Sequence, residues 1–289
     1  MTDDHDHDHD HDHDHDHDRG LAHDLTTLAD FARRRALLKW GLALGAMPLL
    51  GCASTSGGGS DSSSAAGANG TAGDATVPDT GSCSTIPEET SGPYPGDGTN
   101  GQNALTLNGI VRSDIRSSIA GASGVAEGVA LTVTLTVLDG QNGCRPLVGH
   151  AVYLWHCDRQ GNYSMYAAAT ANENYLRGVQ ATDDAGQVTF TTIFPACYSG
   201  RWPHIHFEVY PSLASASTGL NASVTSQLAL PKAACDDTYA QSGYAASVSN
   251  LKTMSLATDM VFADGAELET PVMTGSAVNG FAATLSVTV

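Results

Sequence analysis

Hydrophobic and polar residues alternate with a period of two along several stretches in the second half of the chain. The clearest stretch is 131–137, where Leu and Val at the odd positions are separated by three threonines. Because successive side chains of a strand point to opposite sides, this pattern predicts a half-buried strand. Similar alternation, or a short apolar run typical of a central strand, recurs at 152–155, 187–194, 204–209 and 281–289. The sequence therefore predicts an all-β domain.

Turn signals separate these stretches. They are Asp139-Gly140, Asn142-Gly143, Ala185-Gly186, Asp264-Gly265 and Asn279-Gly280. No segment between residues 83 and 289 keeps a helical period for long. We therefore predict one antiparallel β-sandwich over residues 83–289. Residues 211–250 alternate poorly, and we expect a long loop there, of the kind that often carries function.

The first 82 residues are predicted to hold an export signal and a flexible linker. Residues 5–17 alternate seven His with Asp and have no apolar face, which predicts a disordered tract that binds metal loosely at most. Three arginines at 33–35 then precede an apolar run too short to span a bilayer, as in a signal peptide. The basic segment resembles a twin-arginine motif, and Leu49-Leu50-Gly51-Cys52 resembles a lipobox.

These features predict three parts of the chain: a leader and signal peptide at 1–51, a flexible Ser/Gly-rich linker at 52–82, and the folded domain at 83–289. We expect export to the cell envelope with a lipid anchor at Cys52, or secretion. The whole chain has a net charge of −18, and removal of residues 1–51 would leave −12. Such an acidic chain argues against a nucleic-acid partner, because phosphates select Lys and Arg patches.

Five cysteines follow Cys52, and an exported protein can form disulfides. Because five is an odd number, at least one thiol stays free or pairs between chains. They are Cys83, Cys144, Cys157, Cys197 and Cys235. No two of them form a CxxC pair, which gives little support to a zinc site of the cysteine type. We expect the two nearest the candidate site, Cys157 and Cys197, to be small buried residues.

A candidate metal site combines two histidines with two tyrosines. In a strand over 204–209, His204 and His206 point to one side while the intervening apolar residues point to the other. Imidazoles alone would suit zinc, copper or nickel as well as iron. Tyr163 and Tyr198 change this, because a phenol with a pKa near 10 coordinates as phenolate only to a strong Lewis acid. The set therefore favours Fe³⁺.

Several motifs together resemble the intradiol ring-cleavage dioxygenases, the family of catechol 1,2-dioxygenase and protocatechuate 3,4-dioxygenase. In chain order they are Thr90-x-Gly92-Pro93-Tyr94, Trp155-His156-x-Asp158-x-x-Gly161-x-Tyr163, Leu176-Arg177-Gly178, Thr182-Asp183 with Gly186, Thr192-Ile193-x-Pro195-x-x-Tyr198 and Arg201-x-Pro203-His204-x-His206. Their order and spacing extend over residues 84–230, most of the predicted domain.

The resemblance implies that Tyr163, Tyr198, His204 and His206 hold a mononuclear non-haem Fe³⁺. It implies that a catechol displaces Tyr198, which accepts a substrate proton, and that Arg201 stabilises negative charge on the ring. Gln227 matches a glutamine that contacts the same region. The ring would be cleaved by O₂ between its two hydroxyl-bearing carbons to give a muconate-type diacid. His150 and His156 match no ligand position and are interpreted as structural.

The chain also departs from the family. A Ser/Gly linker replaces the helical dimerisation region of the catechol 1,2-dioxygenases, and the substrate stays open among catechol, protocatechuate, hydroxyquinol and larger plant phenols. Arg177 or Arg201 could offset the acidic surface for an anionic substrate. Two alternatives remain: an exported β-sandwich that binds catechols or iron–catecholate complexes without turnover, and a lipid-anchored surface protein whose site is vestigial. The presence of all four ligands and Arg201 disfavours the second.

Overall fold

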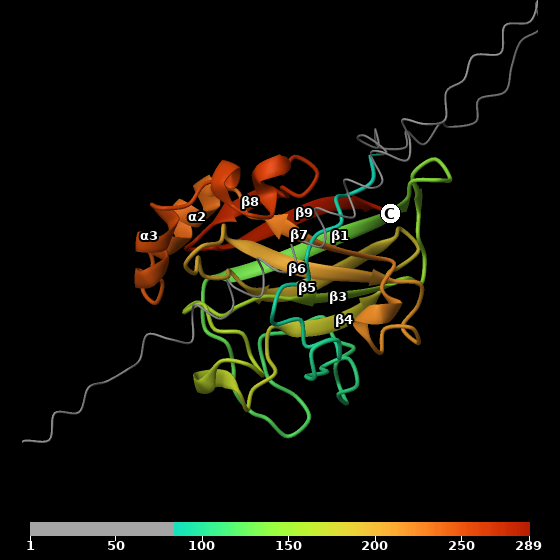
Figure 1. Ribbon diagram of the computed structural model, residues 1–289, viewed down its shortest axis with the longest axis horizontal. Coiled ribbons are helices and arrows are strands. Elements are labelled where there is room, and N and C mark those ends of the chain that lie inside the picture. The colour runs from blue at the N-terminus through green and yellow to red at the C-terminus, as the bar shows by residue number, and fades with distance from the viewer. Residues whose placement is uncertain (1–83) are drawn as a thin grey trace, which may run out of the picture.

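The computed structural model describes residues 84–289, which form two packed β-sheets (Figure 1). The predicted leader, signal peptide and linker lie outside the described residues. The strands are β1 (Ala130–Asp139), β2 (Arg145–Pro146), β3 (Ala151–Trp155), β4 (Arg177–Ala181), β5 (Gln187–Ile193), β6 (His204–Tyr210), β7 (Val224–Ala229), β8 (Val272–Ser276) and β9 (Gly280–Thr288). Within residues 84–289, no helix is both long and apolar enough to cross a membrane.

The first sheet has the order β2-β1-β9-β8, and β5 also pairs with β1. Strands β2 and β5 pair antiparallel with successive parts of one edge of β1, while β9 covers the other edge in parallel. The predicted β-sandwich is thus confirmed, but its first sheet is mixed. Period-two alternation gives the faces of a strand and says nothing about the direction of its partner, so this parallel pair was not foreseeable from the pattern.

The second sheet has the order β4-β3-β6-β7 and is antiparallel throughout. Strand β3 is buried at every position and lies in the middle, as its wholly apolar sequence predicts. Its register places Trp155 opposite His206 on β6, and His206 in turn lies opposite Gln227 on β7. Three neighbouring strands therefore bring Trp155, His206 and Gln227, which lie 51 and 21 positions apart in the chain, onto one line across the sheet.

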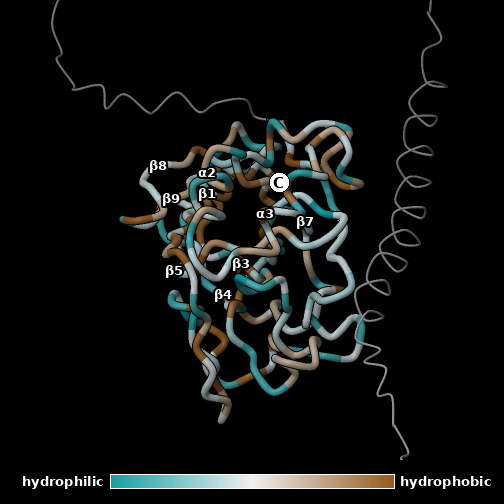
Figure 2. The backbone as a smooth tube through the Cα atoms, turned by 90° about the vertical axis from the view of Figure 1, so that its left-hand side faces the viewer, coloured by the Kyte–Doolittle hydropathy of each residue, from teal (hydrophilic) through white to brown (hydrophobic). Residues whose placement is uncertain are grey.

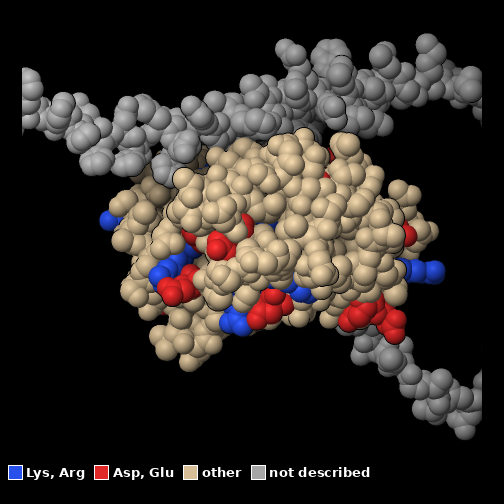
Figure 3. All heavy atoms as spheres, turned by 90° about the horizontal axis from the view of Figure 1, so that it is seen from below, with Lys and Arg blue, Asp and Glu red and all other residues tan. Residues whose placement is uncertain are grey.

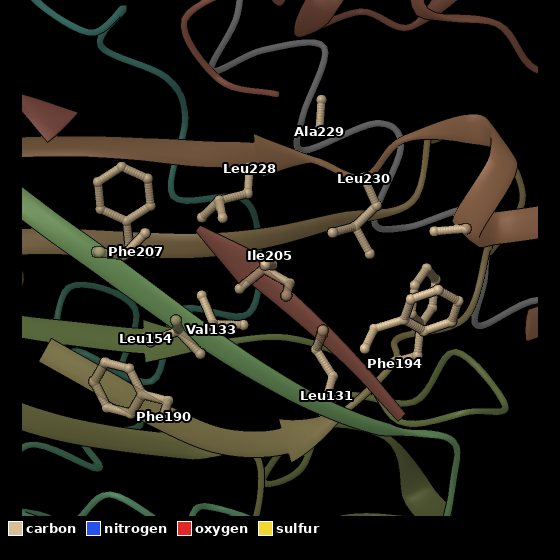
Figure 4. Close-up of a cluster of buried hydrophobic side chains, with 14 of the residues drawn as sticks. Leu131, Val133, Leu154, Phe190, Phe194, Ile205, Phe207, Leu228, Ala229 and Leu230 are labelled. Atoms are coloured by element: carbon tan, nitrogen blue, oxygen red, sulfur yellow. The ribbon is translucent and has the colours of Figure 1, made fainter. Parts of the chain in front are cut away.

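The hydrophobic core fills the space between the sheets. Figure 4 shows side chains of β1, β3, β5, β6 and β7 pointing toward one another there. In Figure 2, short hydrophobic stretches (brown) are interspersed with more polar ones along the backbone. Ile205 and Phe207 belong to this core and are fully buried. A second apolar cluster, which includes Tyr153 and Trp155, lies on the outer face of the second sheet. Strand β6 is therefore buried on both faces.

The prediction of a long loop over 211–250 is wrong. The segment holds β7 and two short helices, α2 (Lys232–Tyr239) and α3 (Ala245–Leu251), which lie at one end of the sandwich near β8 (Figure 1). Strand β7 escapes the pattern because its polar residue Gln227, on the same face as His206, is buried and hydrogen-bonded rather than exposed. Helices of seven and eight residues owe their stability to packing, so they leave little periodic signal. Four 3₁₀ turns complete the fold: Ala168–Thr170, Gly219–Asn221, Leu256–Thr258 and Phe262–Asp264.

The cysteines behave largely as the sequence predicts. Cys144 is disulfide-bonded, whereas Cys157, Cys197 and Cys235 are free and buried. Burial raises the pKa of the Cys197 thiol to about 12. The expectation that at least one thiol stays free is confirmed, as is the expectation that Cys157 and Cys197 are packed inside.

Candidate metal centre

Strand β6 presents the two candidate histidines on the face turned away from the sandwich core. His204 and His206 are each 2% exposed, and their Nε2 atoms lie 3.1 Å apart. The side chain between them, Ile205, points into the core. The His-x-His alternation read from the sequence is therefore confirmed. The ring of Trp155 stacks on His206 with centroids 4.9 Å apart and fixes the plane of that imidazole.

A tight turn places Tyr163 after β3. The Oδ1 atom of Asp158 accepts hydrogen bonds from the backbone N–H groups of Gln160 (2.8 Å) and Asn162 (2.9 Å). Gly161 has a φ of +93°, and a Cβ there would lie 3.2 Å from the Cβ of Tyr198. The glycine thus permits both the left-handed turn and the close approach of the second tyrosine. The Asp-x-x-Gly-x-Tyr motif is accounted for by this geometry.

The oxygen atoms of both tyrosines converge on the Nε2 atom of His204. The Oη atom of Tyr198 lies 3.1 Å from Nε2 of His204, and that of Tyr163 lies 3.4 Å from the same atom. Tyr163 is 4% exposed, whereas Tyr198 is half-buried in the connection between β5 and β6. The structure therefore brings all four predicted ligands together, three of them inside the protein and one nearer the solvent.

Hydrogen bonding and burial set the state of the imidazoles. Nδ1 of His204 lies 2.5 Å from the backbone oxygen of Trp202, so Nδ1 carries the proton and Nε2 keeps its lone pair. Burial lowers the pKa of both His204 and His206 well below 6.5, which keeps them neutral. Nδ1 of His206 is buried and has no hydrogen-bond partner among the described residues. Both imidazoles are therefore neutral, the form in which a histidine can bind a metal ion through a nitrogen lone pair.

The donor set fits a small cation of high charge. Burial raises the pKa of Tyr163 well above 10, so its phenol ionises only beside a strong Lewis acid. Within residues 84–289, no group of three or more His, Cys, Asp or Glu side chains could hold a metal ion. The cluster at His204 is of another kind, because two of its four donor atoms are phenol oxygens of tyrosines. Oxygen donors of this kind favour a hard metal over zinc or copper.

Arg201 lies beside the cluster in a buried network. Its Nε atom donates to Oδ2 of Asp259 at 3.0 Å, and its Nη2 atom donates to Oε1 of Gln227 at 2.7 Å. Gln227 also donates from Nε2 to the backbone oxygen of Thr90 at 2.8 Å. The predicted catalytic residues Arg201 and Gln227 are therefore in direct contact, and the guanidinium is held in one orientation.

Asp259 is a residue that the sequence did not reveal. It is fully buried, and its Oδ2 atom also accepts the backbone N–H of Trp202 at 2.6 Å. Its Oδ1 atom accepts the N–H groups of Val261 and Phe262. A single Asp between short 3₁₀ turns carries no motif or period, so no sequence signal could have identified it.

Two other residues considered at the sequence level lie outside the donor cluster. His156 is 1% exposed, and its ring nitrogens lie 2.7 Å from the backbone oxygen of Cys157 and 2.7 Å from Oγ1 of Thr192, in keeping with a structural role. Arg177 is fully buried and hydrogen-bonded to the protein itself. The idea that Arg177 offsets the charge of an anionic substrate is therefore not supported by its surroundings.

Comparison with known proteins gives a consistent picture. Residues 113–217 match the family model described as Dioxygenase. The fold is similar to the intradiol ring-cleavage dioxygenase from Tetranychus urticae, with 26% identity and a TM-score of 0.55 over 71% of this chain and 94% of that one. No curated protein sequence matches the chain significantly.

Two further solved structures are more distant. The dioxygenase domain of a dioxygenase carbohydrate-binding protein fusion from Streptomyces sp. SirexAA-E is 21% identical, with a TM-score of 0.46 over 71% of this chain and 98% of that one. Catechol 1,2-dioxygenase from Pseudomonas arvilla C-1 is 19% identical, with a TM-score of 0.43 over 70% of this chain and 61% of that one.

Proposed function

We propose that the chain is an intradiol ring-cleavage dioxygenase that uses a non-haem Fe³⁺ to cleave a catechol-type substrate with O₂; the match of residues 113–217 to the dioxygenase family model and the likeness to the Tetranychus urticae enzyme support this. Cleavage between the two hydroxyl-bearing carbons would give a muconate-type diacid. One observation carries this proposal. The Nε2 atom of His204 lies 3.1–3.4 Å from three other candidate donor atoms: the phenol oxygens of Tyr163 and Tyr198 and the Nε2 atom of His206. When bound, Fe³⁺ supplies a Lewis acid that ionises phenols and an electron-accepting centre for the reaction with O₂.

Each of the four side chains has a distinct part in this proposal. His204 and His206 are fixed by the Trp202 carbonyl and by stacking on Trp155, so they serve as permanent ligands. Tyr163 is buried among them. Tyr198 is half-buried, and it is the side chain best placed to move aside and to accept a proton from a catechol hydroxyl at its Oη atom.

Arg201 provides fixed positive charge at the site. Its bonds to Asp259 and Gln227 hold the guanidinium in place before any substrate arrives. A preorganised charge costs no rearrangement when negative charge develops on the aromatic ring, and this is the usual source of electrostatic catalysis. Gln227 acts through Arg201 in this proposal, because it holds the Nη2 atom and is itself tied to the backbone at Thr90.

We favour a substrate whose ring bears no carboxylate. Arg177 has its five donors occupied by the protein, and Arg201 is already paired with Asp259. Figure 3 shows basic side chains interspersed with acidic ones on one face rather than gathered into a basic patch. A carboxylate brought into the site would lose its hydration, at a cost of several kcal/mol, and would have to compete with Asp259 for Arg201. The ratio of kcat/KM between catechol and 3,4-dihydroxybenzoate tests this, and we expect catechol to be favoured by at least about tenfold.

The proposed location is the cell envelope. The leader and lipobox read from the sequence support export with an anchor at Cys52, and the disulfide at Cys144 suits an oxidising compartment. Metabolic labelling with a fatty acid, compared between the native chain and Cys52→Ala, tests the anchor.

The decisive experiment for the function uses protein reconstituted with Fe³⁺. We expect a red preparation with about one iron per chain, O₂ uptake on addition of catechol, and appearance of a ring-opened diacid. Bound but unchanged catechol would favour the alternative of a binding module. A colourless protein that takes up no iron would contradict both readings.

A further inference from the structure

Arg177 is fully buried beside the proposed iron ligands. Every N–H group of its guanidinium donates a hydrogen bond to an acceptor in the protein. An arginine side chain has five N–H groups, and here five hydrogen bonds are present. Nε donates to Oγ of Ser164 (3.0 Å), Nη1 to the backbone oxygen of Pro95 (2.7 Å) and Oη of Tyr153 (3.1 Å), and Nη2 to the backbone oxygens of Tyr94 (3.0 Å) and Ser164 (2.9 Å).

These acceptors come from three separate parts of the chain. Ser164 directly follows the ligand Tyr163, Tyr94 and Pro95 belong to the first segment of the domain, and Tyr153 lies on β3. Arg177 itself is the first residue of β4. The guanidinium therefore connects Ser164, next to the proposed iron ligand Tyr163, to the segment at Tyr94 and Pro95 and to strand β3, neither of which contains an iron ligand.

The first segment carries an aromatic side chain toward the ligand. The ring of Tyr94 lies 5.2 Å from that of Tyr163 and 5.2 Å from that of Tyr166, measured between centroids. The Cζ atom of Arg177 lies 5.5 Å from the centroid of the Tyr166 ring. Gly96 makes room for this arrangement, because a Cβ there would lie 2.8 Å from Nη1 of Arg177.

The backbone is strained on both sides of this contact. Leu176, next to Arg177, has a φ of +58°, and Met165, next to Ser164, has a φ of +72°. Left-handed residues other than glycine cost on the order of 1–3 kcal/mol and persist where the surroundings hold them. Strain of this kind beside a ligand indicates that the positions of Ser164 and Arg177 are imposed on the chain.

From this geometry we propose that Arg177 is a positioning residue for the reaction: it sets the place of Tyr163 and of the neighbouring Tyr94 ring without touching substrate. This inference rests on the proposed function, because it concerns the ligand set of that same site. All five acceptors are uncharged, so the planar fork of the guanidinium matters here rather than the pairing of opposite charges. A lysine in the same place has three donors and no such fork.

The test compares Arg177→Lys with a matched control, Arg112→Lys. Arg112 supports the same strand from another side, since its Nε and Nη2 atoms donate to the backbone oxygen of Arg177 at 3.0 and 2.6 Å. Its remaining hydrogen bonds go to the backbone oxygens of Ser117 and Asn174, away from Ser164 and Tyr94. Both variants and the native protein are loaded with Fe³⁺. The measurements are the position of the tyrosinate-to-iron absorption band, retention of iron against a chelator, kcat and KM, and thermal unfolding of the iron-free protein.

We expect Arg177→Lys to shift the absorption band, to lose iron faster and to lower kcat by about 10- to 100-fold, as displacement of a reacting group by about 1 Å does. Arg112→Lys should keep the native band and kcat. If Arg177→Lys does not fold, Ser164→Ala decides, because it removes the acceptor of Nε, along with the hydrogen bond from the same hydroxyl to the backbone oxygen of Tyr175, and leaves the other four acceptors of Arg177 in place. It should shift the band in the same direction.

Two results would overturn the proposal. The first is that Arg177→Lys or Ser164→Ala keeps the native absorption band, iron retention and kcat. The second is that Arg112→Lys loses as much as Arg177→Lys, which would mean that both arginines only support β4 in general. Failure of the proposed function is distinguishable, because the native protein would then bind no iron or leave catechol intact.

Discussion

Arg201 and Asp259 form an ion pair of 3.0 Å between side chains that are 2% and 0% exposed, although they lie 58 residues apart in the chain. This pair joins the loop that carries Tyr198 to the 3₁₀ turns that precede β8. Other contacts act in the same direction, because Ser247 Oγ accepts the N–H of Cys197 and Asn250 donates to its carbonyl. Ser247 and Asn250, in the segment expected to be a loop, therefore hold one side of the site together with Asp259.

Asp259→Ala is expected to destabilise the fold by about 3–5 kcal/mol, because it leaves a buried guanidinium without its counter-charge. The free energy of unfolding from urea denaturation measures this. Asp236→Ala is the control: Asp236 pairs with Lys232 on the surface, where both side chains are more than half exposed, so its loss costs about 1 kcal/mol or less. Equal costs for the two variants would contradict a structural role for the buried pair.

Arg201→Ala is expected to keep the iron and its red colour but to lose most of its turnover. The ligands remain in place, while the charge that stabilises the transition state is gone; loss of one such group costs about 100- to 1,000-fold in kcat. Absorbance and O₂ uptake on the same sample provide the check. Normal turnover would show that the assigned role of Arg201 is wrong.

Tyr163→Phe is expected to lose iron and colour, because the buried phenol oxygen is removed while the ring still fills its space. The measurement is iron content after reconstitution and dialysis. Tyr175→Phe is the matched control: Tyr175 is similarly buried, at 8% exposed, and its Oη atom makes only a long contact of 3.5 Å with Asp158. A Tyr163→Phe protein as red as the native one would remove this tyrosine from the ligand set.

Gln227→Ala is expected to lower kcat/KM by about 10- to 100-fold, corresponding to one hydrogen bond to a charged group of about 1.5–3 kcal/mol. Its side chain bridges Arg201 and the backbone of Thr90, so its loss frees Nη2 to reorient. Iron content should stay at the native level. Loss of iron instead of rate would place Gln227 in support of the ligands.

The free cysteines are expected to resist thiol reagents in the native protein. Cys157, Cys197 and Cys235 are each at most 1% exposed. Mass spectrometry after alkylation should find these three residues unmodified under native conditions and modified in denaturant. Rapid native labelling of Cys197, next to Tyr198, would mean that this loop opens readily.

The sequence allowed the centre of the site to be predicted because strand alternation and motif spacing are local. The two faces of β6 follow from a period of two, and Gly161 marks the turn before Tyr163. What escaped prediction is non-local. Asp259 pairs with Arg201, which lies 58 residues away, and β9 pairs in parallel with β1 although the two strands are far apart in the chain. The polar residues of β7 also obscured that strand, because the partners that let Gln227 be buried, Arg201 and Thr90, lie far away in the sequence.

The central claim is that the chain opens an aromatic ring between its two hydroxyl-bearing carbons. The most direct measurement is mass spectrometry of the product formed from catechol and ¹⁸O₂ by the Fe³⁺-loaded protein. The account predicts a muconate-type diacid in which one ¹⁸O atom enters each of the two new carboxyl groups. A product cleaved outside the two hydroxyl-bearing carbons, or catechol recovered intact, would contradict it.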